Sequence, residues 1–163
     1  MAVLKSTPVM RIKPFSDVYI STGNGRLKPA LKKGFDALGG IGKFVKPGQS
    51  VLLKPNLTAG VDPATGGTTS AAFTEAIIEL IKEHCNPGTI YVGENTDVGK
   101  TTMDTFTKYG FVEMCQRQGV ELVDFTDTER VDTPLPGAMF ADVVSLPKLV
   151  MDVDVFKIGR AHV

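Results

Sequence analysis

The sequence predicts an α/β protein with a mostly parallel sheet and helices on both faces, a Rossmann-like three-layer fold with a β-hairpin near the C-terminus. Short β-branched or aromatic runs alternate with helical segments of ten or more residues, and connections of that length favour right-handed crossovers between parallel strands. The run Val51-Leu52-Leu53 is apolar on both faces, which is typical of a buried parallel strand. The 163 residues, 42% of them hydrophobic, suffice for one core.

The first half of the chain alternates strand, helix and strand. The run Val18–Ser21 predicts a strand, because it is β-branched and aromatic and ends at a glycine-rich turn. Pro29 can occupy the first turn of a helix that reaches Leu38, where Gly39-Gly40 stops it. Residues 50–53 predict the next strand, and Lys54-Pro55-Asn56 ends it.

The second half continues the alternation and adds a hairpin. Apolar residues with helical spacing predict a helix that ends at Asn86-Pro87-Gly88; they are Phe73, Ala76, Ile77, Leu80 and Ile81. The next predicted elements are a strand at 89–92, a helix at 101–118 broken at Gly110, and a strand at 120–123. Runs at 130–135 and 139–144 flank Pro136-Gly137 and predict an antiparallel hairpin, after which Pro147 opens a short helix and 152–156 begin a strand.

The C-terminal residues differ from the rest of the chain. A strand is begun near Phe156, and Ile158–Val163 follow at once without a helix or cap. These six residues are similar to the translation of a common sequencing adapter. We therefore expect residues 1–157 to form a single, truncated and incomplete α/β domain, and residues 158–163 to be a non-native tail.

Composition excludes several classes of protein. Eighteen basic and eighteen acidic residues give no net charge, which argues against nucleic-acid binding. No apolar run has the length of a signal peptide or a membrane span, and Cys85 and Cys115 are too few for a disulfide scaffold, so we expect a cytoplasmic protein. The charges are uneven: residues 1–60 carry ten basic and two acidic groups, and we expect this to reflect solvated helix faces rather than a ligand.

The carboxyl ends of the predicted strands indicate where a site would lie, because ligands of parallel sheets bind at that edge. Lys54 and Asn56 supply a cation and an amide after one strand, and Glu94 follows the next. Hydroxyls at the start of the following helix can cap amides or hold an anion. The predicted site residues are, as catalytic groups, Lys54 and Glu94; as ligand-binding groups, Asn56, Thr68, Thr69 and Asp97; and, as a structural residue, Pro55.

Three other motifs give weaker evidence for a function. The segment Gly93–Thr101 lies between a strand and a helix as a P-loop does, but five residues separate its glycines where four are required, which disfavours nucleotide hydrolysis. Lys28 occupies the third glycine position of a dinucleotide fingerprint that Gly23 and Gly25 would begin. Cys85 and Cys115 have no Cys-x-x-Cys spacing, so we interpret both as buried structural thiols.

The order of these segments resembles the family known as domain of unknown function 362. The resemblance rests on the run Val51–Asn56, the loop with Thr68-Thr69, the strand ending in Glu94, and the strand Val120–Asp124. It implies a family of anaerobic bacteria and archaea whose members often carry a ferredoxin-like iron–sulfur segment after this domain. An iron–sulfur cluster is therefore expected only in sequence beyond this chain, and a ferredoxin-type segment or partner with it.

Three functions remain open from the sequence, and the least favoured is phosphoryl transfer through Gly99-Lys100-Thr101, which nucleotide titration would test. In the first, the chain is an enzyme or enzyme fragment that binds a small anionic or metal-associated ligand: Lys54 contacts the anion, Asn56 orients it, and Glu94 is the base or a metal ligand. In the second, it is a non-catalytic module that binds such a ligand or docks an electron-transfer partner. We expect Lys54, Asn56, Thr69 and Glu94 to face one cleft.

Overall fold

The computed structural model describes residues 25–58, 61–95 and 101–159. Its centre is a four-stranded parallel sheet in the order β3-β2-β1-β6. The strands are β1 (Val51–Lys54), β2 (Ile90–Glu94), β3 (Glu121–Asp124) and β6 (Val155–Ile158). The predicted fold class is confirmed, because this sheet is parallel and flanked by helices. The strand expected at 18–21 lies outside the described residues.

The helices lie where the apolar periodicity and the breakers predict them. They are α1 (Leu27–Ala37), α2 (Ala71–Cys85), α3 (Thr102–Lys108), α4 (Phe111–Gln118) and α5 (Lys148–Asp152), with short 3₁₀ turns η1 (Ile41–Lys43) and η2 (Pro63–Thr65). Gly110 separates α3 from α4 as predicted, because it adopts φ 75°, which an L side chain rarely adopts. The break lets Phe106 and Phe111 both point into the core, their ring centroids 5.9 Å apart.

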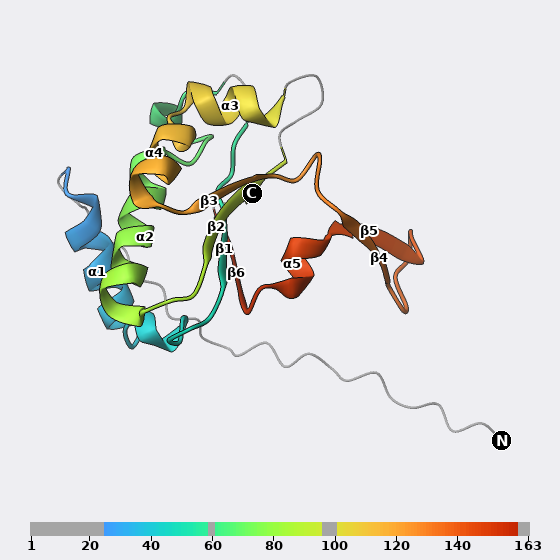
Figure 1. The fold of residues 1–163 in the computed structure, drawn as a ribbon, viewed down its shortest axis with the longest axis horizontal. Coiled ribbons are helices and arrows are strands. Elements are labelled where there is room, and N and C mark those ends of the chain that lie inside the picture. Colours follow the sequence, from blue (N-terminus) through green and yellow to red (C-terminus); the bar gives the residue numbers. More distant parts are fainter. Residues whose placement is uncertain (1–24, 59–60, 96–100, 160–163) are drawn as a thin grey trace.

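The path of the chain explains which helices cover which face. The connections from β1 to β2 and from β2 to β3 step across the sheet in one direction. The connection from β3 to β6 runs back across β2 and β1 and places β6 on the far side of β1. Because right-handed crossovers tie direction to face, the returning segment must cross on the other side. Figure 1 shows α1, α2 and α4 on one side of the sheet and α5 with the hairpin on the opposite side.

The returning segment contains the predicted antiparallel hairpin, but its second strand starts later than predicted. It consists of β4 (Arg130–Pro134) and β5 (Val143–Pro147), and Pro134 pairs with Val143. The expected start at Met139 was wrong because the chain turns at residues 135–138, where Gly137 has φ 81° and Ala138 donates to the Leu135 carbonyl. Met139 and its neighbour Phe140 therefore lie in the loop, 88% and 96% exposed.

The core lies between the sheet and the helices α2, α3 and α4. Alternate strand positions face it, since Val51 and Leu53 of β1 and Ile90 and Val92 of β2 belong to one buried cluster. Both cysteines are buried and free, which confirms them as core thiols. Burial raises the pKa of the Cys115 thiol to about 11.

Charged residues of opposite sign form ion pairs between neighbouring helices. Lys28 of α1 forms ion pairs with Glu79 and Glu83 of α2, and Glu75 of α2 accepts two 2.9 Å hydrogen bonds from the Arg117 guanidinium of α4. Lys28, from the basic half of the sequence, therefore neutralises two acidic groups of the other half.

The last strand includes the first residue of the predicted foreign tail. β6 ends at Ile158, which pairs with Lys54, and residues 160–163 lie outside the described part of the chain. The origin of residues 158–163 stays a prediction.

Candidate functional site

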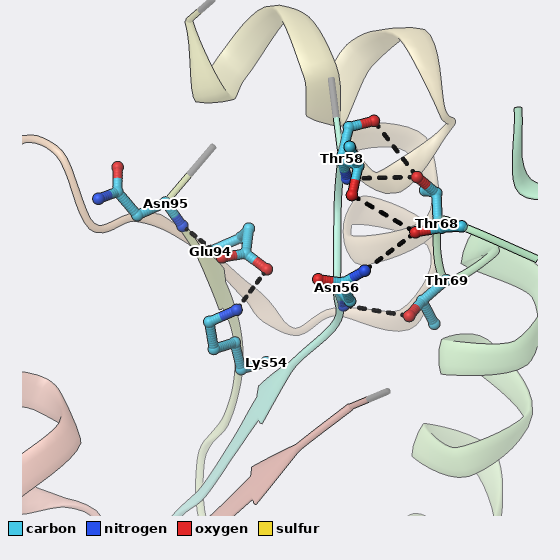
Figure 2. Close-up of polar contacts among 8 residues, drawn as sticks. Lys54, Asn56, Thr58, Thr68, Thr69, Glu94 and Asn95 are labelled. Atoms are coloured by element: carbon cyan, nitrogen blue, oxygen red, sulfur yellow. Dashed lines mark hydrogen bonds and ion pairs between the residues drawn. The ribbon is translucent and has the colours of Figure 1, made fainter. Parts of the chain in front are cut away.

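The two predicted catalytic residues end adjacent parallel strands. Lys54 is the last residue of β1 and Glu94 the last of β2, and the register pairs Leu53 with Val92 just before them. The Lys54 Nζ atom lies 2.7 Å from Glu94 Oε2 (Figure 2). The adjacency of the two strand ends, which the topology rule predicts, therefore produces a direct ion pair.

Glu94 is the most deeply buried carboxylate of this site. Only 2% of the residue is exposed, and burial raises its pKa above the ordinary value, since a charged carboxylate loses hydration there. Three contacts oppose that effect: the Lys54 ammonium, the Asn95 amide 2.8 Å from Oε1, and a backbone hydrogen bond from Leu57. Burial outweighs them, so Glu94 holds its proton to higher pH than an exposed glutamate.

A second polar cluster joins the loop after β1 to the start of α2. The backbone N–H of Asn56 donates to Thr69 Oγ1 at 3.0 Å, and the backbone N–H of Thr69 donates to the backbone carbonyl of Asn56 at 2.8 Å. The side-chain Nδ2 of Asn56 donates to the backbone carbonyl of Gly67. Thr68 Oγ1 both accepts from the Thr58 amide and donates to the Thr58 carbonyl. Asn56 and Thr68 thus hold two chain segments together (Figure 2).

A pocket of about 360 Å³ opens beside this cluster, between the carboxyl ends of β1 and β6 and the first turns of α2. Its wall combines charged, hydroxyl and apolar groups. It is lined by Leu53, Lys54, Pro55, Pro63, Gly66, Thr68, Thr69, Ser70, Phe73, Thr74, Ile77, Lys157 and Gly159. The volume lies within the range typical of small-molecule sites.

Two hydroxyls at the α2 N-terminus retain a hydrogen for a ligand. Ser70 is the N-cap, and its Oγ accepts from the Phe73 amide at 3.2 Å. Thr69 Oγ1 likewise acts as an acceptor in its bond from Asn56. A hydroxyl that accepts can still donate once, and the aligned peptide dipoles of a 15-residue helix favour an anion at this end.

The structure divides the predicted site into two parts. Lys54, Pro55, Thr68 and Thr69 line the pocket, whereas Asn56 and Glu94 do not. The expectation of one cleft shared by Lys54, Asn56, Thr69 and Glu94 is therefore not met, because Glu94 is buried under the Leu57 backbone and Asn56 is held in the loop. Asp97 lies outside the described residues.

Sequence analysis missed the apolar part of the pocket. Phe73 and Ile77 were assigned to the core stripe of a helix, but Phe73 is 37% exposed and lines the pocket with Ile77. A weak signal existed: Phe73 lies three residues after the cap Ser70, in the first turn of the helix. Lys157 of β6 was also missed, since the strand's pairing with β1 brings it to this edge.

Grouped metal ligands are not found in the part of the chain that the structure describes, where no three of its His, Cys, Asp and Glu side chains gather. Nor is any helix among those residues long and apolar enough to cross a membrane.

The fold places this chain among α/β proteins with a parallel sheet and polar groups at its carboxyl edge. The family "Domain of unknown function (DUF362)" matches residues 51–157, and the chain belongs to this family. It is 33% identical over 134 residues to the "Thylakoid-associated protein sll1697" of Synechocystis sp. (strain ATCC 27184 / PCC 6803 / Kazusa), covering 77% of this chain and 41% of that protein. The chain thus spans less than half of this relative. No solved structure matches it significantly.

Proposed function

We propose that this chain is an enzyme or part of one, and that it binds a small anionic ligand in the pocket between the ends of β1 and β6 and the N-terminus of α2. One observation carries the proposal: Thr69 and Ser70 line this pocket at the positive end of a helix, beside Lys54, whose ammonium group is turned towards Glu94. Two O–H donors and a helix N-terminus attract the same kind of ligand, an oxyanion, and the two lysines that line the pocket, Lys54 and Lys157, add positive charge beside them.

Lys54 connects this pocket to the buried carboxylate. It lines the pocket, and its ammonium group bonds to Glu94. In the proposed enzyme, Lys54 contacts the anion, and Glu94 accepts or returns a proton through Lys54, a role suited to a carboxyl whose pKa burial has raised. Asn56 supports the site indirectly by holding Thr69 in place.

A second candidate is a binding module without catalysis. The observation that favours it is that Glu94 is 2% exposed and does not line the pocket. In this function the Lys54–Glu94 pair is structural, and it only sets the charge of the pocket wall.

Titration calorimetry with inorganic phosphate tests the binding site. Replacing Glu94 by Gln removes the competing carboxylate, so Glu94→Gln should bind phosphate more tightly than the unmodified chain. The neutral double variant Lys54→Met/Glu94→Gln leaves no unpaired buried charge and should bind at least about fivefold more weakly than Glu94→Gln, the effect of one close cation. Lys43→Met, an exposed lysine outside the pocket, is the matched control and should change nothing. Equal affinities in all variants would contradict the site.

Proton exchange separates the enzyme from the module. If the ligand communicates with Glu94, phosphate binding will take up or release a proton, and the apparent binding enthalpy will depend on the ionisation enthalpy of the buffer. The Glu94→Gln variant should lose that dependence. Phosphate binding without proton exchange in the unmodified chain would favour the module.

The cellular context is part of the proposal. We propose a cytoplasmic protein that acts on a small molecule without nucleic acid, and whose redox link, a ferredoxin-type partner or an iron–sulfur segment in a longer form, follows from the family resemblance. The balanced charge of the chain supports the exclusion of nucleic acid. The relative's name places that protein at the thylakoid, so fractionation of cells into membrane and supernatant is the direct test.

A further inference from the structure

The pocket has an apolar part that an inorganic anion would leave empty. Phe73 and Ile77 are four residues apart on α2 and therefore share one face of the helix, and Leu53 of β1 also lines the pocket. Phe73 is 37% exposed, although it is a large apolar side chain near the core. These three side chains form a wall that a ligand could cover.

The polar and apolar parts of the pocket are arranged in order along α2. Ser70 marks the N-terminus of the helix, Phe73 lies in its first turn, and Ile77 lies one turn further. With a rise of about 1.5 Å per residue, the wall extends roughly 10 Å from the Ser70 hydroxyl to Ile77. An anion held at the helix N-terminus would therefore have apolar surface directly below it.

The volume allows both parts of the pocket to be filled at once. A cavity of about 150 Å³ accommodates benzene. The pocket of about 360 Å³ is more than twice that size, which leaves room for an oxyanion beside a ring or a branched alkyl group.

We propose that the ligand of this site is an organic oxyanion, a phosphate ester or carboxylate whose aromatic or branched aliphatic body packs on Phe73, Ile77 and Leu53 while its charged group lies at Ser70 and Thr69. The inference rests on the proposed function, because it takes the anion site as its anchor. It adds the chemical class of the ligand, which the anion site alone leaves open.

The test compares phenyl phosphate with inorganic phosphate by titration calorimetry on the full chain. Phenyl phosphate should bind at least about tenfold more tightly, the gain expected from covering an apolar side chain. Phe73→Ala should remove most of that preference, because the ring that would cover the phenyl group is gone. Phe44→Ala is the matched control, because Phe44 is 45% exposed and does not line the pocket.

The possible failures are distinguishable. Equal binding of the two probes, or a preference that survives Phe73→Ala, would overturn the inference and leave the anion site standing. Binding of neither probe would overturn the anion site and the inference with it. Phe73→Leu keeps an apolar side chain in the wall and should retain part of the preference, and circular dichroism of each variant checks that it folds.

Discussion

Gly93 allows an aromatic ring to pack directly on the sheet, and adding one methyl group there should destabilise the fold. Gly93 precedes Glu94 in β2, and a Cβ atom at this position would lie 2.4 Å from Phe125 Cζ, 2.6 Å from Phe125 Cε1 and 3.2 Å from Leu52 Cδ1. Carbon atoms are comfortable at about 3.5–4.0 Å, so the ring must retreat by about 1 Å. Phe125 is 3% exposed and Leu52 is fully buried, which leaves little space for that movement.

The expected cost follows from that crowding. Gly93 is not among the glycines with positive φ, so its backbone suits alanine and the contact alone opposes the substitution. Overpacking of a filled core costs about 1–3 kcal/mol. For a chain of this size Gly93→Ala should lower the melting temperature by about 2–12 °C.

Urea unfolding followed by circular dichroism measures this cost in two backgrounds. In Phe125→Ala the ring is absent, so adding Gly93→Ala should cost almost nothing further. Gly42→Ala is the control, since nothing lies within 4 Å of a Cβ there, and it should change stability by less than about 0.5 kcal/mol. If Gly93→Ala costs the same with and without the Phe125 ring, the packing argument is wrong.

Three further predictions concern titrating groups. Burial raises the pKa of Glu94, so the stability that this group contributes is complete below about pH 4.5 and is lost as the pH rises through its folded pKa. Glu94→Gln should therefore gain stability relative to the unmodified chain as the pH rises. Urea midpoints of the two proteins that differ by a constant amount at every pH would contradict this prediction. Hydrogen bonds from Ser50 lower the pKa of Asp154, so Asp154→Asn should destabilise the chain at neutral pH, with the difference in midpoint disappearing as the pH falls below about 3.8. Because burial raises the pKa of Cys115 to about 11, Ellman's reagent should label it slowly at about pH 8 and rapidly in guanidinium chloride; fast labelling of the folded chain would show that the thiol is accessible.

The Lys54–Glu94 pair shows why a charged pair is not by itself evidence of catalysis. Taking Glu94 out of water is costly, and removing Lys54 alone would leave that carboxylate buried without its cation. A loss of activity in Lys54→Ala could therefore arise from misfolding. Comparing Glu94→Gln with the neutral double variant avoids this ambiguity, because neither leaves an unpaired buried carboxylate.

Local patterns in the sequence were enough to predict the helices and strands and the edge of the sheet at which polar residues gather. Apolar periodicity located α2, Gly110 located the break between α3 and α4, and the run Val51–Leu53 identified a buried strand. These signals are local, since they depend on the period of a helix, the backbone freedom of glycine and the burial of both faces of a strand. The topology rule correctly made the ends of β1 and β2 neighbours, and Lys54 and Glu94 end those two strands.

The roles of these residues depend on contacts between segments that are distant in the sequence. Whether Glu94 faces a pocket or a backbone depends on how the loop after β1 folds over the strand ends, and that loop is held by Asn56 contacts with residues eleven and thirteen positions away. The apolar wall at Phe73 depends in the same way on where β1 and β6 end relative to α2, a relation between segments distant in the chain. Such relations depend on how distant segments pack against one another. The local patterns of a single sequence predict each segment, but they do not show which distant segments come into contact.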